Sequence, residues 1–466
     1  MKNNLLYRGS LVGFLFITLN IVNAQQPINL VSINDFGAIP NDNKDDSDAI
    51  RRALAVNGEI TMNRGIYNVH GITQLNHNTM IYGNGSTFIG QLDTTGNGRT
   101  SKNILTLQGE KIVVKDLLLD GAYTNGNAKE GTNISSLLHI YNSSSILLDG
   151  VNTVNHASNW WNSKVFNFSQ LNSNHEMDMY HVIYIGFSKN ITINNMEQKR
   201  NLKTEGLLIY ESDKITIQGF KSKHSPKIWT SLNIIASDNI ILNNIEVSDG
   251  EINEGGSSIN FIANHNFIVK NTKTSTKQGF DISNEVQGIN SNEKITRATS
   301  YGIFKNCHFE GQRAFYGYPS LNKNKKIIFK NTKFIPTKEG DSTWGIRIQN
   351  AEDIQFDYCT FGSKEFKTSA IIMGGSRDIT ITNCSFINPS IGVYLFGRKF
   401  RKLSLENNFF DGKDYSPVTF YWNKSYVGEG KLTEFYLKKN RNRGKLLNNN
   451  FFNIKGDFQI KKIIIN

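Results

Sequence analysis

The chain has 466 residues, a formal net charge of +12 and only 3 cysteines. Length alone would allow two or three ordinary domains, but stacked repeats escape that limit because each repeat contacts only its neighbours. After the first 24 residues no stretch is long and apolar enough to cross a bilayer. We therefore expect a soluble mature protein whose basic surface suits an acidic partner.

The N-terminus has the pattern of a secretory signal peptide. Lys2 and Arg8 precede a mostly apolar run from 11 to 22, and small residues suited to cleavage end at Ala24. Thr18 interrupts the run, which argues against a membrane anchor. We expect residues 1–24 to be removed, leaving a protein that is secreted, periplasmic or on the cell surface. An exported protein is not expected to bind nucleic acid or to insert into a membrane.

Residues 45–55 predict a short helix near the start of the mature chain. Acidic and capping residues come first, and apolar residues follow at helical spacing. A solenoid end exposes backbone donors that invite edge pairing. We expect this helix to cap the N-terminal end of a repeat structure.

A repeat of roughly 25 residues follows. Each unit is a short strand, a polar turn rich in Asn, Ser and Asp, a second strand and a third short strand. The second-strand markers Ile191, Ile215, Ile240 and Phe267 are 24, 25 and 27 residues apart. The predicted fold is all-β, a single-stranded right-handed parallel β-helix solenoid over residues 25–466, and we expect a monomer. The segment from about Gly412 departs from the repeat and is expected to close or flank the far end.

The three cysteines occur at one phase of this repeat. Cys307, Cys359 and Cys384 each stand two residues before a phenylalanine. Cysteines in register form an inward stack of small apolar side chains. We interpret them as structural, with neither a metal nor an obligatory disulfide.

Three segments together resemble the opening of the pectate-lyase-like β-helix superfamily: 34–38 (NDFGA), 45–50 (DDSDAI) and 65–69 (GIYNV). The group includes polysaccharide lyases, polygalacturonase-type hydrolases, alginate epimerases and phage tailspike depolymerases, so the resemblance implies a fold and a carbohydrate substrate rather than one reaction. The polygalacturonase signatures and the Arg-x-Pro-x-x-Arg motif of many pectate lyases are absent. Gly279-Phe280-Asp281 resembles part of an alginate-epimerase strand, but Gln278 and Ser283 replace its Tyr and His.

The strand register predicts which side chains face outward from the first sheet, where such proteins usually bind their substrate. If Leu138, Ile183 and Phe280 point inward, the residue after each points outward. The expected outward row is His139, Tyr184, Leu208, Asn233, Asn260, Asp281, Tyr316 and Arg347. A second row two residues further on is Tyr141, Gly186, Tyr210, Ile235, Ile262, Ser283, Tyr318 and Gln349.

Asp281 is the most informative residue of the first row, because Asp is disfavoured inside strands. The predicted catalytic residues are Asp281, Arg347, Tyr210, Lys227 and His224. The predicted substrate-binding residues are His139, Tyr184, Asn233, Asn260, Tyr316, Tyr318, Trp344 and Glu205. Surface packing or a solvated sheet face is the alternative role for each aromatic or amide residue taken alone.

An acidic polysaccharide is the expected substrate, with β-elimination favoured over hydrolysis. Elimination needs a base and a group that neutralises the enolate, for which Asn233, Asn260, Arg347 or a bound Ca²⁺ would serve. Tyr210, His224 and Lys227 are candidate bases. Hydrolysis needs two carboxylates about 5–5.5 Å or about 6.5–9.5 Å apart, and the row offers only Asp281, with Glu205, Glu254 and Glu285 as possible partners. A hydrolase acting on an acidic or sulfated polysaccharide and a non-catalytic glycan-binding or adhesion solenoid stay open.

Overall fold

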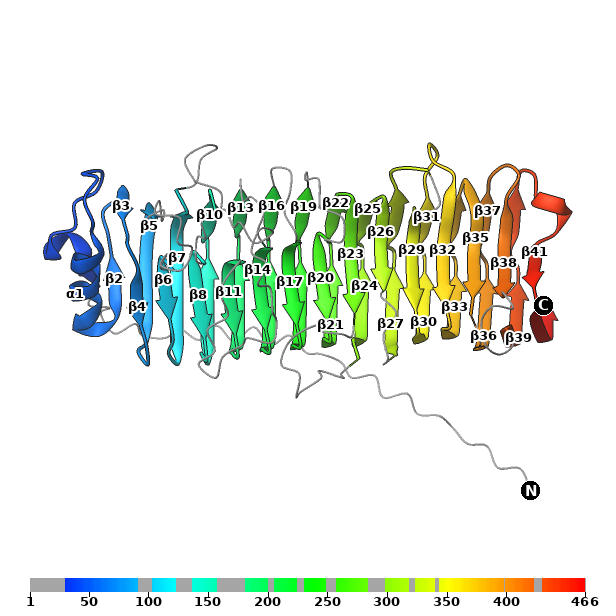
Figure 1. Cartoon of the computed structure of the whole chain (residues 1–466), viewed down its shortest axis with the longest axis horizontal. Helices are drawn as coiled ribbons and strands as arrows, with labels where there is room; N and C mark the ends of the chain where they lie inside the picture. Colours follow the sequence, from blue (N-terminus) through cyan, green and yellow to red (C-terminus); the bar gives the residue numbers. More distant parts are fainter. Residues whose placement is uncertain are drawn as a thin grey trace, which may run out of the picture.

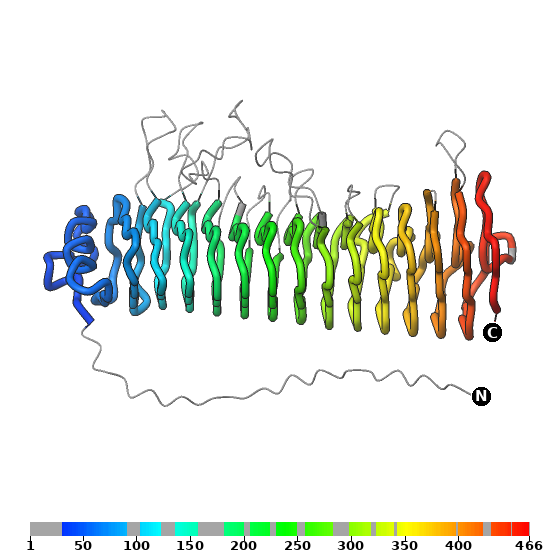
Figure 2. Tube along the Cα trace, turned by 90° about the horizontal axis from the view of Figure 1, so that it is seen from below, coloured from blue at the N-terminus to red at the C-terminus, as the bar shows by residue number. Residues whose placement is uncertain are grey.

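The chain winds into one elongated stack of coils, seen in a computed structural model (Figures 1 and 2). The coils follow one another in sequence order from the N-terminal helix to the last strands. This arrangement confirms the predicted parallel β-helix. The structure describes residues 30–90, 103–122, 136–156, 181–199, 205–223, 230–248, 257–283, 298–317, 323–339, 343–397, 399–422 and 430–465.

Three faces of strands, here called sheets 1, 2 and 3, form the wall of the stack. Sheet 1 contains 14 strands, and every neighbouring pair is parallel. Its strands are β4 (Ile72–Gln74), β6 (Leu105–Leu107), β8 (Leu138–Tyr141), β11 (His181–Gly186), β14 (Glu205–Tyr210), β17 (Thr230–Ile235), β20 (Ile259–Ile262), β23 (Gln278–Ser283), β26 (Arg313–Gly317), β29 (Trp344–Gln349), β32 (Thr368–Gly374), β35 (Pro389–Phe396), β38 (Ser416–Trp422) and β41 (Phe452–Gly456).

Sheets 2 and 3 are hydrogen-bonded into one 28-stranded sheet, because β5 and β7 run across the corner between them. Sheet 2 holds β1 (Val31–Ser32), β2 (Glu59–Thr61), β5 (Thr79–Ile89), β7 (Lys111–Asp120), β9 (Ser145–Asp149), β12 (Lys189–Asn194), β15 (Asp213–Gln218), β18 (Asp238–Asn243), β21 (His265–Lys270), β24 (Ser300–Lys305), β27 (Asn324–Lys330), β30 (Ala351–Asp357), β33 (Arg377–Thr382), β36 (Lys399–Glu406), β39 (Gly430–Lys438) and β42 (Phe458–Ile465). Sheet 3 holds β3 (Ile66–Asn68), β10 (Asn152–Val154), β13 (Glu197–Lys199), β16 (Lys221–Lys223), β19 (Glu246–Ser248), β22 (Lys273–Ser275), β25 (His308–Gly311), β28 (Lys333–Pro336), β31 (Thr360–Gly362), β34 (Ser385–Ile387), β37 (Phe409–Asp411) and β40 (Arg441–Arg443).

The predicted capping helix is confirmed as α1 (Ser47–Asn57), which follows a 3-10 turn, η1 (Ile33–Phe36). Its apolar residues, including Ile50 and Leu54, are buried and belong to the main core. The backbone N–H of Gly58 ends the helix by donating to the carbonyl of Leu54, in a left-handed conformation that glycine adopts readily. The helix therefore seals the hydrophobic interior at this end.

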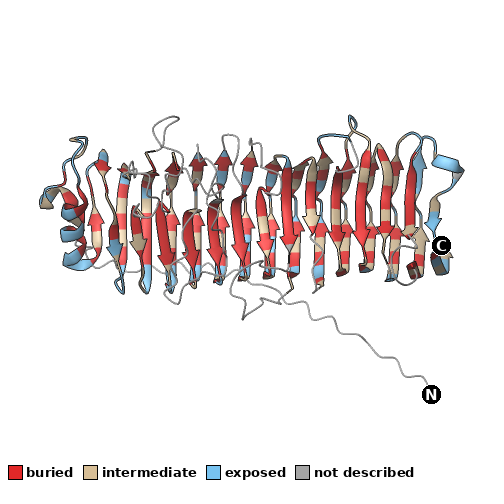
Figure 3. Cartoon of the chain, in the orientation of Figure 1, coloured by how far each residue is buried: buried red, intermediate tan, exposed pale blue. Residues whose placement is uncertain are grey.

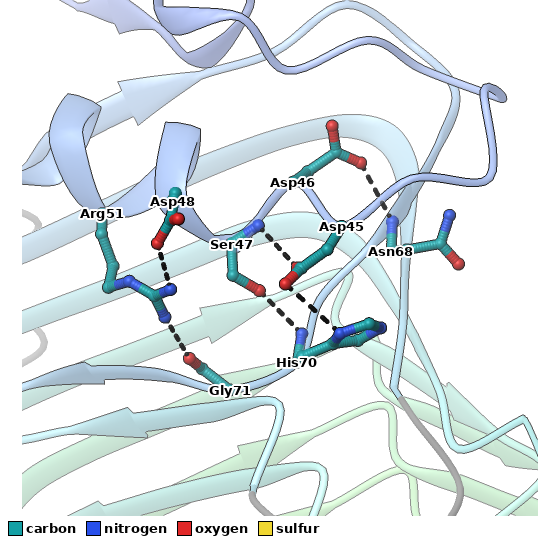
Figure 4. A network of polar contacts seen from close by, with 8 residues as sticks. All are labelled: Asp45, Asp46, Ser47, Asp48, Arg51, Asn68, His70 and Gly71. Carbon is teal, nitrogen blue, oxygen red and sulfur yellow. Dashed lines mark hydrogen bonds and ion pairs between the residues drawn. The ribbon is translucent and has the colours of Figure 1, made fainter.

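The acidic residues before α1 fasten the helix to the first coils (Figure 4). Asp45 Oδ1 accepts a hydrogen bond from the Ser47 N–H at 2.9 Å, and Asp46 Oδ2 accepts one from the Asn68 N–H at 3.1 Å. Ser47 Oγ accepts the His70 N–H at 2.7 Å. These are residues of the motif through which the sequence resembles the superfamily, so that motif encodes the cap rather than a catalytic centre.

The interior is filled by apolar strand residues, most of them completely buried (Figure 3). Phe334, Phe361, Phe386 and Phe410 form a column of stacked rings in sheet 3, with centroids 5.1, 5.1 and 4.3 Å apart. Glycines in sheet 1 leave room for this column, since a Cβ on Gly392 would lie 2.7 Å from the Phe410 ring. Burial of such rings, at roughly 25 cal/mol per Å² of apolar area, is the main source of stability.

Asparagines shape the corner between sheets 2 and 3, where the chain must turn in every coil. Asn271, Asn306 and Asn331 occupy equivalent positions with φ of +50°, +55° and +46°. Asn tolerates this left-handed conformation better than most residues. The Asn331 amide donates to Asn306 at 3.0 Å, so the asparagines also link adjacent coils.

The cysteines are buried and unpaired with one another, as predicted. Cys359 and Cys384 lie on adjacent coils, and the Cys359 N–H donates to the Cys384 sulfur at 3.3 Å. Thr332 occupies the coil between Cys307 and Cys359. Its hydroxyl donates to the backbone carbonyl two residues earlier in the chain, as the Cys307 thiol does. Burial raises the pKa of Cys307 to about 12, which keeps this thiol protonated and inert.

The segment after Gly412 corrects one expectation. The sequence indicated that it leaves the repeat, but β38 to β42 continue all three sheets. A 3-10 turn, η3 (Leu447–Asn449), and longer connections change the spacing. Leu403, Phe435 and Ile463 are aligned on successive coils although they are 32 and 28 residues apart, so the period is hidden in the sequence.

Candidate functional site

The outward row of sheet 1 has the predicted register at every position. Parallel pairing aligns, in order, His139, Tyr184, Leu208, Asn233, Asn260, Asp281, Tyr316 and Arg347. The residues before them, such as Ile183 and Phe280, belong to the main core and are completely buried. Adjacent members of the row are one strand spacing apart, about 4.8 Å.

The N-terminal half of the row is covered and mostly apolar. Tyr184, Leu208, Tyr210 and Ile235 form a second hydrophobic cluster, separate from the interior, and here called the outer cluster. The His139 ring stacks on Tyr184 with centroids 4.7 Å apart and planes 13° from parallel. The next outward position on the Tyr184 strand is a glycine, whose Cβ would lie 2.2 Å from the tyrosine hydroxyl. These contacts are those of a packed layer.

The two polar rings of this half do not titrate near neutral pH. Burial, with a smaller contribution from His181, lowers the pKa of His139 to about 4. Burial raises the pKa of Tyr184, and Glu211 raises it further. The His139 ring is therefore neutral and the Tyr184 phenol protonated at neutral pH, as expected of two rings packed against each other.

Three aromatic residues of the predicted site have no open ring face. Tyr184, Tyr210 and Trp344 are 0 %, 1 % and 4 % exposed. Trp344 instead donates its indole N–H to the Phe315 carbonyl at 3.2 Å. A sugar ring could stack on these side chains only after a rearrangement, so they do not form sugar-binding subsites in this conformation.

The C-terminal half of the row is polar, and Asp281 is its centre. Asp281 is 1 % exposed, and its Oδ2 accepts a hydrogen bond of 2.6 Å from the Gln278 amide three residues earlier in β23. Tyr316 follows on the next strand and is half-buried. Burial raises the pKa of Tyr316 and Asp281 adds to this, while Arg347 and Arg313 oppose it. The phenol is therefore protonated at neutral pH and stands between a carboxylate and a guanidinium.

Arg347 is a half-buried cation held by aromatic rings. Its Cζ lies 5.7 Å from the Tyr316 ring centroid, 5.2 Å from that of Trp344 and 5.5 Å from that of Phe396. The Gln349 side-chain oxygen, turned toward it, accepts from Nε at 2.9 Å and from Nη2 at 2.8 Å. Within the described residues Arg347 has no carboxylate partner, so its remaining N–H groups can receive an anion.

The predicted catalytic residues do not all meet. Asp281 and Arg347 lie two strands apart with Tyr316 between them. Tyr210 belongs to the second row and lies three strands from Asp281, about 14 Å away. His224, Lys227 and Tyr318 lie outside the described residues, and Glu205 begins β14 without a described side chain. Their roles stay predictions.

Two polar neighbours of the site, Gln278 and Arg313, were not predicted from the sequence as site residues. Gln278 and Arg313 are paired on adjacent strands, three residues before Asp281 and Tyr316 respectively. Arg313 also lies over the Trp344 ring, with Cζ 5.1 Å from its centroid. Scanning the position three residues before each member of the row would have shown this second polar column.

The described residues hold one carboxylate at the site and no group of three His, Cys, Asp or Glu suited to a metal. A calcium ion needs six to eight oxygen ligands, of which Asp281 supplies a single carboxylate. The present side chains therefore do not by themselves form a calcium site. No described helix has the length and hydropathy needed to span a bilayer.

Comparison with known proteins identifies the fold. Residues 277–410, which contain Asp281, Tyr316 and Arg347, match the family model described as a right handed beta helix region. No curated protein matches the sequence. The chain is thus a right-handed parallel β-helix, as predicted.

Three solved structures illustrate the likeness. Tailspike protein 3 of bacteriophage CBA120 is 12 % identical with a TM-score of 0.54, over 89 % of this chain and 61 % of that one. The chain therefore spans about three fifths of that tailspike. A mutant tailspike of Escherichia coli bacteriophage HK620, in complex with a hexasaccharide, is 10 % identical with a TM-score of 0.51, over 91 % and 80 % of the chains. The A-module of mannuronan C-5 epimerase AlgE4 from Azotobacter vinelandii is 12 % identical with a TM-score of 0.45, over 93 % and 97 %.

Proposed function

We propose that the chain is an exported enzyme that depolymerises an acidic polysaccharide by β-elimination at Asp281, Tyr316 and Arg347. The observation that carries the proposal is Arg347, a half-buried cation fixed by three rings and an amide but lacking a described anionic partner. A charge held in this way is costly unless a ligand neutralises it. The carboxylate of a uronic acid has the matching charge and shape.

The chemistry divides among the three side chains. The free N–H groups of Arg347 bind the uronate carboxylate and stabilise the negative charge that develops when the adjacent C5 proton leaves. Asp281 accepts that proton, which requires the side chains around it to move on substrate binding, because Asp281 is only 1 % exposed. The C4–O bond breaks as the C4=C5 double bond forms, and the protonated phenol of Tyr316 gives its proton to the departing oxygen. Gln278 orients the Asp281 carboxylate through the 2.6 Å hydrogen bond.

The hexasaccharide complex of the similar tailspike supports a glycan as the ligand. The net charge of +12 supports an acidic one, because positive charge concentrates anionic substrates near a protein. Hydrolysis is the second candidate, since it also needs a carboxyl group and Asp281 supplies one. It is ranked lower because the described residues provide no second carboxylate on the row.

The test is incubation with polygalacturonate, polymannuronate and a sulfated galactan. Elimination creates a conjugated double bond, which absorbs near about 235 nm. The proposal predicts a rise in that absorbance with one of the uronate polymers, and its loss in Arg347→Met. New reducing ends without the absorbance would establish a hydrolase instead, and binding without either signal would indicate a non-catalytic solenoid.

A conservative variant separates charge from geometry. Arg347→Lys keeps the charge but loses the planar group that contacts both Gln349 and an anion. We expect it to recover less than about a tenth of the wild-type rate. Wild-type turnover in this variant would contradict the role assigned to the guanidinium.

A further inference from the structure

A second basic surface lies at the corner between sheets 2 and 3, which sheet 1 does not border. Three successive coils place a basic residue on each side of the turn asparagine. Lys270, Lys305 and Lys330 are aligned at the end of sheet 2, and Lys273, His308 and Lys333 are aligned at the start of sheet 3. These six residues are here called the basic strip.

The basic strip is not neutralised by its surroundings. None of its five lysines forms an ion pair with a described residue, and four of them are exposed. The nearest carboxylates on the same columns are Glu246 and Asp357, one coil beyond either end. Glu310 follows His308 by two residues in β25, and its Oε2 lies 3.4 Å from His308 Nε2.

Stacking like charges on adjacent strands is unfavourable. Lys270, Lys305 and Lys330 stand on three consecutive strands of one column, so each lies one strand spacing from the next like charge. Repulsion between these lysines therefore destabilises the free protein, and a bound polyanion would reduce it.

Tyr358 lies on the coil that follows the strip and has a left-handed backbone conformation that is unusual for a bulky residue. It occupies the turn position that Asn306 and Asn331 occupy on preceding coils, with φ of +53°. A bulky residue is strained in this left-handed region, and the tyrosine also interrupts the chain of asparagine amides. Its side chain is 65 % exposed, so no packing contact explains its presence.

We propose that the basic strip and Tyr358 form a second glycan-binding site, which holds a linear anionic polysaccharide along the axis of the β-helix. The cations recur at the strand spacing of about 4.8 Å, close to the length of one sugar residue. The lysines contact the carboxylate or sulfate groups, and the exposed ring of Tyr358 supports the apolar face of a sugar at one end. The site would hold a polymer chain without cleaving it.

A nucleic acid duplex fits the strip less well. The cations form a band only one turn wide, whereas a duplex presents phosphates on both sides of a groove about 12 Å across. Single strands rely on successive aromatic platforms, and the described part of this corner offers one, Tyr358, beside the strip.

The first test removes the charge. Lys270→Gln, Lys305→Gln and Lys330→Gln are combined, and affinity for polygalacturonate and for dextran sulfate is measured by titration calorimetry. We expect binding to weaken about tenfold or more, with a smaller dependence on salt. Lys111→Gln, Lys189→Gln and Lys214→Gln, three exposed lysines on other coils, form the matched control and should change affinity less than about twofold.

The second test uses Tyr358→Asn, which restores the asparagine at the turn. We expect weaker polysaccharide binding together with an unchanged or higher melting temperature, because the substitution relieves strain. A misfolded variant would instead lower both the affinity for the polysaccharide and the melting temperature. Dextran sulfate without polygalacturonate binding would identify sulfate as the anion.

All measurements are made in the Arg347→Met background, so failure of the proposed catalytic function leaves them interpretable. Unchanged affinity in both the lysine variant and Tyr358→Asn would overturn the second site. A duplex DNA that binds more tightly than either polysaccharide and responds to the same lysines would overturn the glycan assignment.

Discussion

The two halves of the outward row of sheet 1 share a backbone but not a chemistry. From His139 to Asn233 the outward side chains are buried, and three of the four are aromatic or aliphatic. From Asn260 to Arg347 they are amide, carboxylate, phenol and guanidinium, held by specific hydrogen bonds and ring contacts. The same regular strand alternation thus serves packing in one half and presents the polar side chains of the proposed site in the other.

The comparison shows that facing outward does not by itself make a residue available to a substrate. Tyr184 and Arg347 occupy equivalent positions of the row. Tyr184 is completely buried, whereas Arg347 keeps an accessible surface and a charge without a described anionic partner. The charge of Arg347 without a described anionic partner, rather than register, distinguishes the proposed site.

The largest expected effect is on turnover in the polar half. Asp281→Asn keeps the shape of the side chain and its contact with Gln278 but removes the proton acceptor. We expect the rate on the preferred uronate polymer to fall by about 10³-fold with little change in the melting temperature. The measurement is the initial rate of absorbance increase, and Lys189→Gln, which changes an exposed lysine outside the outward row, is the comparison variant.

The outer cluster should respond in stability instead. Tyr184→Ala removes a buried ring that packs on His139 and should lower the free energy of unfolding by about 3–4 kcal/mol. Chemical denaturation at neutral pH measures this loss. The rate constant of the remaining folded enzyme should stay within about threefold of wild type. A hundredfold loss of turnover in a folded Tyr184→Ala variant would place this half in the active site.

The pH dependence of stability gives a third contrast. His139 has a pKa of about 4 in the folded chain against 6.5 for an ordinary histidine. As the pH falls from 6.5 toward 4, the unfolded chain takes up a proton that the folded chain does not. Stability should therefore decrease over that range, by up to roughly 3 kcal/mol from this residue. His139→Phe keeps the stacked ring and should flatten the profile, and an unchanged profile would show that His139 is not the cause.

The smallest effect concerns one hydroxyl. Within the described residues the Tyr184 Oη is buried without a hydrogen-bond partner. Tyr184→Phe removes this group and keeps the ring, so we expect a gain of about 1 kcal/mol in unfolding free energy. A loss of similar size would indicate that the hydroxyl is bonded in solution.

Much of the fold follows from the sequence because its signals are local and repeated. The Asn-rich turns, the apolar alternation and the cap residues before Ser47 each report the conformation of their own segment. The coils after Gly412 were missed because longer connections change the spacing while Leu403, Phe435 and Ile463 remain aligned. Alignment in space can persist where periodicity in sequence is lost.

The site was predictable only in part. Register alone brought Asp281, Tyr316 and Arg347 together, since it follows from the strand pattern. Burial of Tyr184, Tyr210 and Trp344 depends on how side chains of the same and adjacent coils pack over one another, which strand alternation alone does not report. Gln278 and Gln349 matter through side-chain orientation, which also lies beyond a pattern of alternating residues.

The measurement that tests the central claim most directly is a crystal structure of Asp281→Asn soaked with an oligosaccharide of the preferred uronate polymer. The account predicts a sugar carboxylate on the free N–H groups of Arg347, with the chain lying over Asn260, Asp281 and Tyr316. An oligosaccharide bound across the outer cluster, with Arg347 left uncontacted, would contradict it.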